Sequence, residues 1–451
     1  MKKVCVVGLG YIGLPTAIVA AESGLQVVGI DIDKDRVDRI NKCCPVIEEP
    51  EIVEKLHNVL SKKVFKASQV YEQADYFIIA VPTPFTEDKK ADLSFVFSAA
   101  TSIATVLKKG DTVILESTVP VGTTKTLSNF LAEKTGLEFG VDFFVSHCPE
   151  RVLPGNIFHE LKVNDRVIGG LDRGSTRHVA SFYKYFVSGD LYLTTAETAE
   201  MIKLVENSYR DVNIAVSHQV ASMAHSIGID PYEVIELANK HPRVNLLRPT
   251  CGVGGHCLAV DPWFLVESFP EYTQLLKTAR EVNEHKPKEV LAAITKAAQK
   301  WKDTHKKQCN ILILGATYKA NVDDLRESPA LFITQELVKN NDIKTMICEP
   351  HVSKDRLGAA LSLRAVSLLD GVDNADIIVC LVAHSQFENL DKKILAHKKV
   401  LDFCGLFHID RKQSPEQEQF YWPAKEQHGV NTDLKSNHYN LLGALEKESE
   451  K

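Results

Sequence analysis

The stretch KVCVVGLGYIGLPTAIVAAESGLQVVGID, residues 3–31, decides the fold of the first part of the chain. An apolar run at 3–7 leads into Gly8-Leu9-Gly10-Tyr11-Ile12-Gly13, which opens a stretch of helical character, and a second apolar run follows at 25–31. Strand, glycine-rich turn, helix and strand in this order predict the first βαβ unit of a doubly wound sheet.

The same stretch predicts a dinucleotide site. Its glycines allow a tight turn, close approach of the backbone to a pyrophosphate, and close packing of helix on strand, while the helix N-terminus offers N–H groups to the phosphates. Asp31 ends the second apolar run and suits the ribose hydroxyls, and its charge favours NAD over NADP. Arg36 would either stack on adenine or neutralise a 2′-phosphate. The residues expected at the cofactor are Gly8, Gly10, Tyr11, Ile12, Gly13, Asp31 and Arg36.

Alternating strand-like and helix-like segments continue along the chain. Apolar runs at 74–82, 111–118 and 143–149 read as further parallel strands. A segment of helical period, about 198–238, reads as one long helix, and after residue 301 the alternation resumes. The predicted fold is α/β, with two Rossmann-like doubly wound domains joined by a long central helix. The expected domains are 1–190 (NAD-binding), 191–300 (central, helical, dimerising) and 301–451 (C-terminal α/β), with a loose tail or loop-rich cap from about 413.

Composition excludes several classes of protein. The 451 residues carry a net charge of -6, so no basic surface points to nucleic acid. No run reaches the roughly 18 apolar residues of a membrane span, and the glycine spacing argues against a signal peptide. The ten cysteines form no CxxC pair, so we expect buried, reduced thiols in a cytoplasmic protein, with one exception. No metal site is expected.

The exception is Cys257, which lies in the segment Gly252-Val253-Gly254-Gly255-His256-Cys257-Leu258-Ala259-Val260-Asp261-Pro262-Trp263. Two glycines before a cysteine let the backbone approach a ligand closely. A thiol in such a place is a nucleophile if its thiolate is stabilised, although a lone cysteine is more often structural.

Ten segments in the same order resemble the UDP-glucose/GDP-mannose dehydrogenase family over nearly the whole chain. They are VGLGYIGLPTA, VPTP, ESTVPVGTT, HCPERVLPG, NDRVIGG, TAEMIKLVENSYRDVNIA, ANKHPRVN, GVGGHCLAVDPWF, TAREVNEHKP and GATYKANVDDLRESPA. The resemblance implies an NAD-dependent oxidoreductase that takes the C6 alcohol of a UDP-sugar to a carboxylate in a four-electron oxidation. The aldehyde would be trapped on the cysteine as a thiohemiacetal, oxidised to a thioester and hydrolysed.

The resemblance also assigns catalytic residues. Cys257 falls on the nucleophile position. Lys203 is expected to act as acid/base on the C6 oxygen, and either its ammonium or the Asn207 amide is expected to stabilise the oxyanion. Lys203 and Asn207 are four residues apart and so share one helical face. The remaining matching polar positions are Thr118, expected to contact NAD and a water, Glu150, expected to activate that water, and Asp261, expected to hold Lys203.

Substrate and cofactor contacts carried by the resemblance are spread over the chain. Thr83 is expected near the nicotinamide, and Arg326 is expected to reach NAD. The C-terminal domain is expected to bind the UDP-sugar. The substrate positions are Arg151, Val152, Lys203, Asn207, Arg210, His241, Arg243, Gly254, Tyr318 and Lys319. His241 and Arg243 match positions that reach the substrate of a neighbouring subunit, and a homodimer or larger homo-oligomer is expected.

Two departures bear on the substrate. Pro154 stands where the UDP-glucose branch has a second glutamate, and Val260 stands where that branch has a lysine. Both departures agree with the N-acetylhexosamine branch, so the expected substrate is UDP-N-acetyl-D-mannosamine, oxidised to UDP-N-acetyl-D-mannosaminuronate. UDP-N-acetylglucosamine, the C2 epimer, is the alternative. A two-electron hydroxyacid dehydrogenase, which needs neither Cys257 nor a second α/β domain, and a nucleotide sensor on the same fold are weaker alternatives.

Overall fold

The predicted βαβ unit is formed by β1 (Lys3–Val7), α1 (Gly13–Glu22) and β2 (Gln26–Ile30). The structure is a computed structural model, and it describes residues 2–407 except 46, 48, 154, 364, 389, 391–394, 396 and 397. Pro154 and the predicted tail lie outside the described residues. The chain divides into two compact units, Met1–Val212 with His256–Arg280, and Asn213–Gly255 with Glu281–Lys451.

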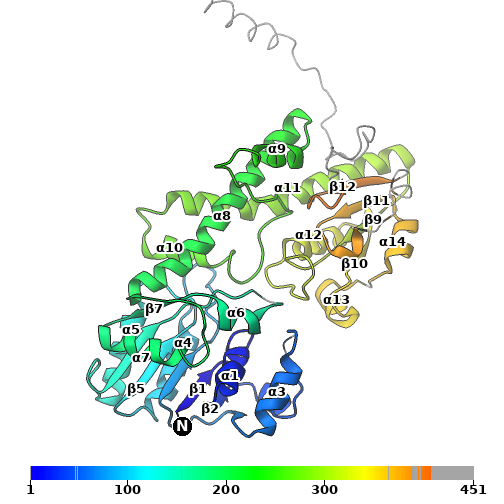
Figure 1. Cartoon of the computed structure of the whole chain (residues 1–451). Coiled ribbons are helices and arrows are strands. Elements are labelled where there is room, and N and C mark those ends of the chain that lie inside the picture. The colour runs from blue at the N-terminus through cyan, green and yellow to red at the C-terminus, as the bar shows by residue number, and fades with distance from the viewer. Residues whose placement is uncertain are drawn as a thin grey trace, which may run out of the picture. The chain divides into compact units, whose positions relative to one another are not determined.

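The first unit is built on an eight-stranded sheet of order β3-β2-β1-β4-β5-β6-β7-β8 (Figure 1). The predicted runs form β4 (Tyr76–Ile79), β5 (Asp111–Leu115) and β6 (Phe143–His147), all parallel as expected. Three strands were not predicted: β3 (Phe65–Ser68), β7 (Arg166–Gly170), which is antiparallel to β6, and β8 (Leu191–Thr195). The sheet therefore continues beyond residue 190, up to the start of the central helix.

Alternation along the strands puts side chains on both faces of this sheet. In β1, Val4 and Val6 pack in one core with α1, whereas Cys5 and Val7 pack in a second core with residues of α4 and α5. Burial on both faces explains why these strands read as continuous apolar runs. The other helices of the unit are α2 (Lys34–Asn41), α3 (Ile52–Ser61), α4 (Ser94–Ala104), α5 (Thr123–Thr135), α6 (Ile157–Val163), α7 (Arg173–Tyr183) and α10 (Asp261–Ser268).

The predicted long helix is α8 (Ala196–Ile227), and it contributes residues to both units. The prediction of one helix up to 238 was wrong at its end. Gly228 has φ +77°, Asp230 caps a new helix by accepting a hydrogen bond from the Tyr232 N–H, and Pro231 begins α9 (Pro231–Ala238). A second helix of 32 residues, α11 (Gln274–His305), also contributes to both units.

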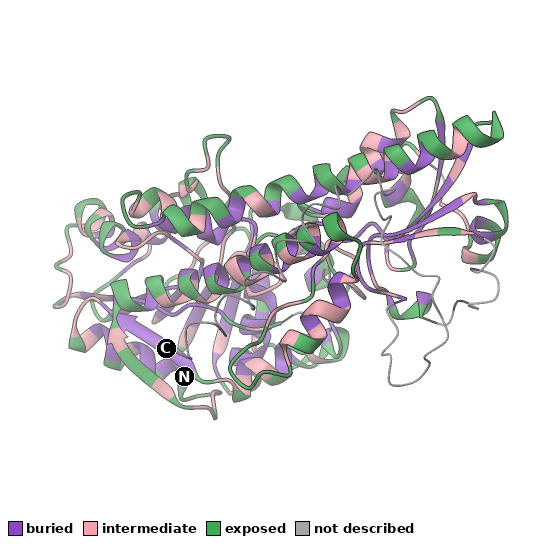
Figure 2. Cartoon of the chain, turned by 90° about the horizontal axis from the view of Figure 1, so that it is seen from above, coloured by how far each residue is buried: buried purple, intermediate pink, exposed green. Residues whose placement is uncertain are grey.

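The second unit contains a four-stranded parallel sheet of order β10-β9-β11-β12. Its strands are β9 (Cys309–Leu314), β10 (Ile343–Cys348), β11 (Ile377–Cys380) and β12 (Lys399–Asp402), in the part of the chain where the alternation was expected to resume. α12 (Pro329–Val338), α13 (Lys354–Leu361), α14 (Leu368–Asn374) and the short η1 (Ser385–Phe387) complete it. Most strands of both units are largely buried, with β8 as an exposed exception, while the helices expose one side (Figure 2).

Seven of the nine cysteines that were expected to be buried are buried. None of the ten cysteines, all of which lie among the described residues, takes part in a disulfide, and Cys257, the expected exception, is half-buried. The expectation of burial was wrong for Cys43 and Cys44, which follow α2 and are half-buried and exposed. Among the described residues, no helix is both long and apolar enough to cross a membrane.

Candidate active site

In the glycine turn after β1, packing requires two of the three glycines but not the third. A Cβ on Gly13 would lie 1.8 Å from the Gly8 carbonyl oxygen, and a Cβ on Gly8 would lie 2.5 Å from the Ala80 oxygen. A Cβ on Gly10 would meet nothing within 4 Å. Gly8 and Gly13 are therefore required by packing, whereas the open space at Gly10, before the N-terminus of α1, leaves room for a pyrophosphate. Tyr11 and Ile12 are half-buried there.

Asp31 is buried at the end of β2, and its carboxylate is held by the protein. Its Oδ2 accepts hydrogen bonds from the Leu9 N–H at 2.9 Å and from Arg36 Nη1 at 3.0 Å, and Oδ1 accepts from the Asp33 N–H at 3.0 Å. The carboxylate thereby fixes the turn that would cradle the pyrophosphate. Arg36 is paired with Asp31. This pairing tests neither of the contacts expected of Arg36, to adenine or to a 2′-phosphate, and both stay predictions.

Thr83 and Thr118, both expected at the cofactor, are brought together in the structure. They follow β4 and β5, which are neighbours in the sheet, and the Thr83 hydroxyl donates to the Thr118 carbonyl oxygen at 2.6 Å. Both lie past the carboxyl ends of parallel strands beside β1, which is the edge where ligands of doubly wound sheets bind.

The predicted catalytic residues of α8 meet the first residue of α10. The Asn207 amide donates to Asp261 Oδ2 at 2.5 Å, although the two residues are 54 positions apart. Asp261 is 2% exposed. Burial raises its pKa to about 6, against the opposing effects of the Lys203 charge and the Asn207 hydrogen bond. The Lys203 charge is also felt by buried His147, whose pKa is lowered to about 3, chiefly by burial. Lys203, Asn207 and Asp261 thus form one constellation.

Cys257 is placed by the turn that leads into α10. Its carbonyl oxygen accepts hydrogen bonds from the N–H groups of Val260 at 2.9 Å and Asp261 at 2.8 Å. The nucleophile candidate and Asp261 are therefore fixed to each other through the backbone. The half-buried thiol is accessible in part, which a nucleophile needs.

Glu150, the predicted water activator, is held by three donors. Oε1 accepts from the N–H groups of Arg151 at 2.7 Å and Val152 at 3.0 Å, and Oε2 accepts from Arg166 Nη2 at 3.1 Å. The predicted substrate positions Arg151 and Val152 are thereby fixed by Glu150. The Arg151 side chain pairs with Glu206 of α8.

Sequence reasoning missed the buried cluster around Arg166. This guanidinium lies 3.9 Å from Glu116 Oε1, and the Tyr183 hydroxyl donates to the same oxygen at 2.5 Å. The Arg166 and Glu116 side chains are 5% and 0% exposed. Burial raises the pKa of Glu116, and the Arg166 charge opposes that rise. The sequence feature that could have indicated this cluster is the arginine of the otherwise apolar strand in the NDRVIGG segment, because a charge buried there needs a partner.

In the second unit, the loop after β9 meets the glycines before Cys257. A Cβ on Gly254 would lie 2.4 Å from the Glu327 oxygen and 2.9 Å from Tyr318 Cβ. The Arg326 carbonyl accepts from the Gly255 N–H at 3.2 Å, and its guanidinium makes a two-pronged contact with Asp324. Gly254, Tyr318 and Arg326 are therefore neighbours. Lys319, next to Tyr318, is exposed.

The remaining predicted substrate residues lie on exposed surfaces. His241 and Arg243 follow α9, and the Arg243 N–H donates to His241 Nδ1 at 3.3 Å. Arg210 is exposed on α8. Their contacts to substrate, including those expected across a subunit boundary, stay predictions.

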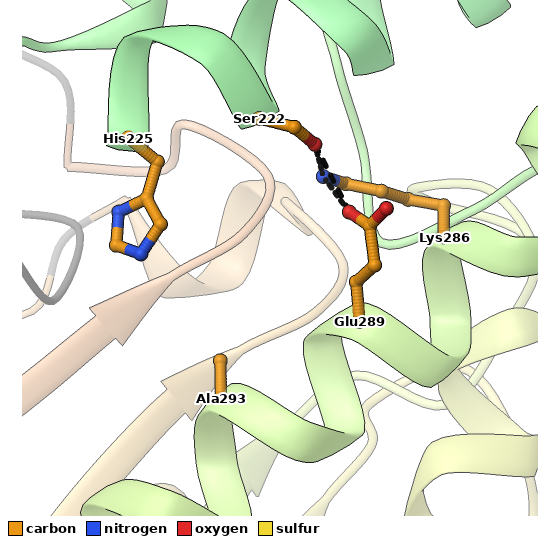
Figure 3. Close-up of a pocket in the computed structure, with 5 residues that line it drawn as sticks. All are labelled: Ser222, His225, Lys286, Glu289 and Ala293. Atoms are coloured by element: carbon orange, nitrogen blue, oxygen red, sulfur yellow. Dashed lines mark hydrogen bonds and ion pairs between the residues drawn. The ribbon is translucent and has the colours of Figure 1, made fainter. Parts of the chain in front are cut away.

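A separate pocket in the second unit is lined by residues of α8 and α11 that the sequence analysis did not single out (Figure 3). The buried Lys286 ammonium donates to Ser222 Oγ and to Glu289 Oε2, both at 3.0 Å. His225 and Ala293 complete the lining. The lysine charge is compensated within the protein, so this cluster stabilises the helix pair and offers no uncompensated charge to a ligand.

Comparison with known proteins identifies one family for the chain. Three domains of the UDP-glucose/GDP-mannose dehydrogenase family match: the NAD binding domain at residues 2–187, the central domain at 197–285 and the UDP binding domain at 312–408. The chain is 45% identical to the NDP-N-acetyl-D-galactosaminuronic acid dehydrogenase of Ralstonia nicotianae, with 91% of this chain and 97% of the relative covered. It is 44% identical to the UDP-N-acetyl-D-mannosamine dehydrogenase of Campylobacter jejuni, with 89% and 99% covered.

A solved structure agrees. The UDP-D-ManNAc dehydrogenase of Pyrococcus horikoshii superposes with a TM-score of 0.82 at 40% identity, and 90% of this chain and 96% of that chain are covered. The expectations of the family, of two α/β domains joined by a long helix and of NAD as cofactor are thereby confirmed. The chain belongs to the UDP-glucose/GDP-mannose dehydrogenase family and is an NAD-dependent oxidoreductase.

Proposed function

We propose that this chain oxidises the C6 alcohol of UDP-N-acetyl-D-mannosamine to the carboxylate in two successive steps, with Cys257 as covalent nucleophile. The observation that carries the proposal is the buried contact between Asn207 and Asp261, beside Lys203. Asp261 lies on the same short segment as Cys257. NAD, when bound, accepts a hydride in each of the two oxidations. A two-electron dehydrogenase needs no such thiol.

Each residue has a role that its surroundings support. An asparagine amide has two N–H donors, and Asp261 takes one of those of Asn207, so the other is aimed and available to an oxyanion. Lys203 takes the proton of the C6 alcohol. The Cys257 thiolate attacks the aldehyde carbon to form a thiohemiacetal, which prevents loss of the aldehyde before the second oxidation.

The thioester formed in that second oxidation is then hydrolysed. We place Thr118 and Glu150 at the attacking water. Three donors already engage the Glu150 carboxylate, so its position is well defined. Glu150 therefore orients the water and fixes the Arg151–Val152 backbone. The substrate choice rests on relatives named for N-acetylmannosamine and N-acetylgalactosaminuronic acid chemistry.

A homodimer built on α8 accompanies this proposal. The helix exposes apolar side chains at intervals of four or seven residues, which places them along one side of a helix. They are Met201, Val205, Tyr209, Val216, Met223 and Ile227. A second copy of the chain would cover this side. Sedimentation of the wild type and of Tyr209→Arg tests this, with a monomeric wild type as the contrary result. A cytoplasmic location stays a prediction.

The test of the chemistry is the yield of NADH per UDP-N-acetylmannosamine consumed to completion. We expect two NADH for the wild type and for Cys44→Ser, a matched control at an exposed thiol. Cys257→Ser should stall or slow greatly. One NADH per sugar in the wild type would contradict the covalent route. Faster turnover of UDP-N-acetylglucosamine or UDP-N-acetylgalactosamine would keep the mechanism and change the substrate.

A further inference from the structure

The two sheets share a turn that the sequence does not reveal. Gly8 follows β1 with φ +93°, and its N–H donates to the Ile30 oxygen at the end of β2 at 2.8 Å. Gly315 follows β9 with φ +89°, and its N–H donates to the Cys348 oxygen at the end of β10 at 3.0 Å. The first turn of the second sheet is therefore built like the cofactor turn of the first.

An acidic residue closes both turns in the same way. Asp31 accepts the Leu9 N–H, and Glu349 Oε2 accepts the Ala316 N–H at 2.7 Å. Two residues further on, the His351 N–H donates to Glu349 Oε1 at 2.8 Å, as the Asp33 N–H donates to Asp31. Glu349 is therefore the counterpart of Asp31, the residue expected to bind a ribose in the first sheet.

The two acids differ in what faces them. The Glu349 carboxylate is 0% exposed and receives Nε2 of His384 at 3.1 Å, a side chain that is also 0% exposed. A ribose hydroxyl has no access to this carboxylate. The Glu349 carboxylate therefore binds only groups of the protein.

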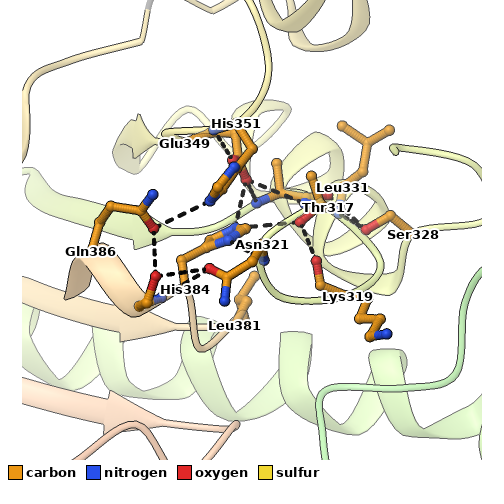
Figure 4. A network of polar contacts seen from close by, with 12 residues as sticks. Thr317, Lys319, Asn321, Ser328, Leu331, Glu349, His351, Leu381, His384 and Gln386 are labelled. Atoms are coloured by element: carbon orange, nitrogen blue, oxygen red, sulfur yellow. Dashed lines mark hydrogen bonds and ion pairs between the residues drawn. The ribbon is translucent and has the colours of Figure 1, made fainter. Parts of the chain in front are cut away.

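His384 ties the carboxylate to the loop that carries Tyr318 and Lys319 (Figure 4). Its Nδ1 accepts the Asn321 N–H at 3.0 Å, so Nδ1 carries no proton and Nε2 is the donor to Glu349. Nε2 also lies 3.3 Å from the Thr317 hydroxyl, which donates to the Lys319 carbonyl at 2.8 Å.

Together these bonds hold the loop at several points. Ala316 and Thr317 at its start donate to Glu349, and Asn321 at its end donates to His384. Between them stand the two residues expected to contact the UDP-sugar. Fully buried groups that are hydrogen-bonded to one another define a single geometry, because leaving any of them unpaired is costly.

We propose that His384 and Glu349 are positioning residues for nucleotide-sugar binding, which hold the 316–321 loop so that Tyr318 and Lys319 meet the uridine diphosphate. This rests on the proposed function, since it takes from it the ligand of the loop. Neither residue touches the substrate. The pair acts before binding, by keeping the loop in its competent arrangement, so its loss weakens apparent affinity in proportion to the competent fraction.

The experiment compares His384→Ala, His384→Gln and the control His351→Ala. The His351 ring is tilted against that of His384, with 4.8 Å between the ring centroids, and its Nε2 contacts Gln386, so its loss leaves the bonds from His384 to the loop in place. UDP binding is titrated calorimetrically, and KM is measured for the UDP-sugar and for NAD. We expect His384→Ala to weaken UDP binding and raise the UDP-sugar KM about tenfold or more, as loss of most of the competent population requires. The NAD KM should change little.

His384→Gln, which keeps a donor and an acceptor, should recover part of the UDP affinity even if His384→Ala folds poorly. Wild-type UDP affinity in both His384 variants would overturn the inference and leave the proposed function intact. An equal loss in His351→Ala would overturn it as well. A wild type that binds no UDP and oxidises no UDP-sugar would overturn the proposed function and the inference with it.

Discussion

Replacing Arg166 with methionine should destabilise the protein far more than removing an exposed lysine. Arg166 Nη2 lies 3.1 Å from Glu150 Oε2, with the side chains 5% and 9% exposed, and Nη1 lies 3.9 Å from the fully buried Glu116. Removing one partner of a buried ion pair leaves the other charge uncompensated and lowers the free energy of unfolding by about 3–5 kcal/mol. That is a large part of the roughly 5–15 kcal/mol that stabilises a typical domain.

The control is Lys66→Met, which breaks the Lys66–Glu72 pair at 2.5 Å, where the side chains are 56% and 31% exposed. Such an exposed pair contributes about 1 kcal/mol or less to the free energy of unfolding. The assay is urea denaturation at neutral pH, with the midpoint of the first transition compared between variants. Adding Glu150→Gln to Arg166→Met should restore part of the loss, because one uncompensated carboxylate disappears. Equal midpoints for Arg166→Met and Lys66→Met would refute the reasoning.

Three further variants test the cofactor turn and the catalytic constellation. Gly13→Ala should abolish soluble folded protein or NAD binding, since its Cβ would lie 1.8 Å from the Gly8 oxygen, whereas Gly10→Ala should fold normally and lose only NAD affinity; circular dichroism and NAD titration distinguish them. Asp31→Asn should raise the NAD KM and reduce the preference for NAD over NADP, and an unchanged preference in a kinetic comparison would contradict its role. The Asp261 pKa is raised from 3.8 to about 6, so the stability that this carboxyl contributes is present below pH about 4 and lost as pH rises through about 6. The stability of Asp261→Asn relative to wild type should therefore increase as the pH rises from 4 to 8, by about 3 kcal/mol at most, while the variant loses activity. Melting curves measured across that pH range test this. They would show no such increase if the carboxyl were solvated.

The local sequence predicted the parts of this molecule that depend on local physics. Continuous apolar runs identified the strands buried on both faces, and the glycine spacing after β1 identified the cofactor turn. The same approach failed at the end of α8, because the helical period continues across Gly228 and Pro231 although the backbone does not. It also missed β7, whose first residue is a charged arginine.

The sequence by itself determined the family, the cofactor turn and which polar residues to suspect, since motifs and periodicity are properties of neighbouring residues. Only the tertiary structure decided how those residues are paired. Asn207 meets Asp261 over 54 positions, and Glu349 meets His384 over 35. The physical reason is that a buried polar group must find a partner wherever packing brings one, and the distance along the chain does not say which partner that is.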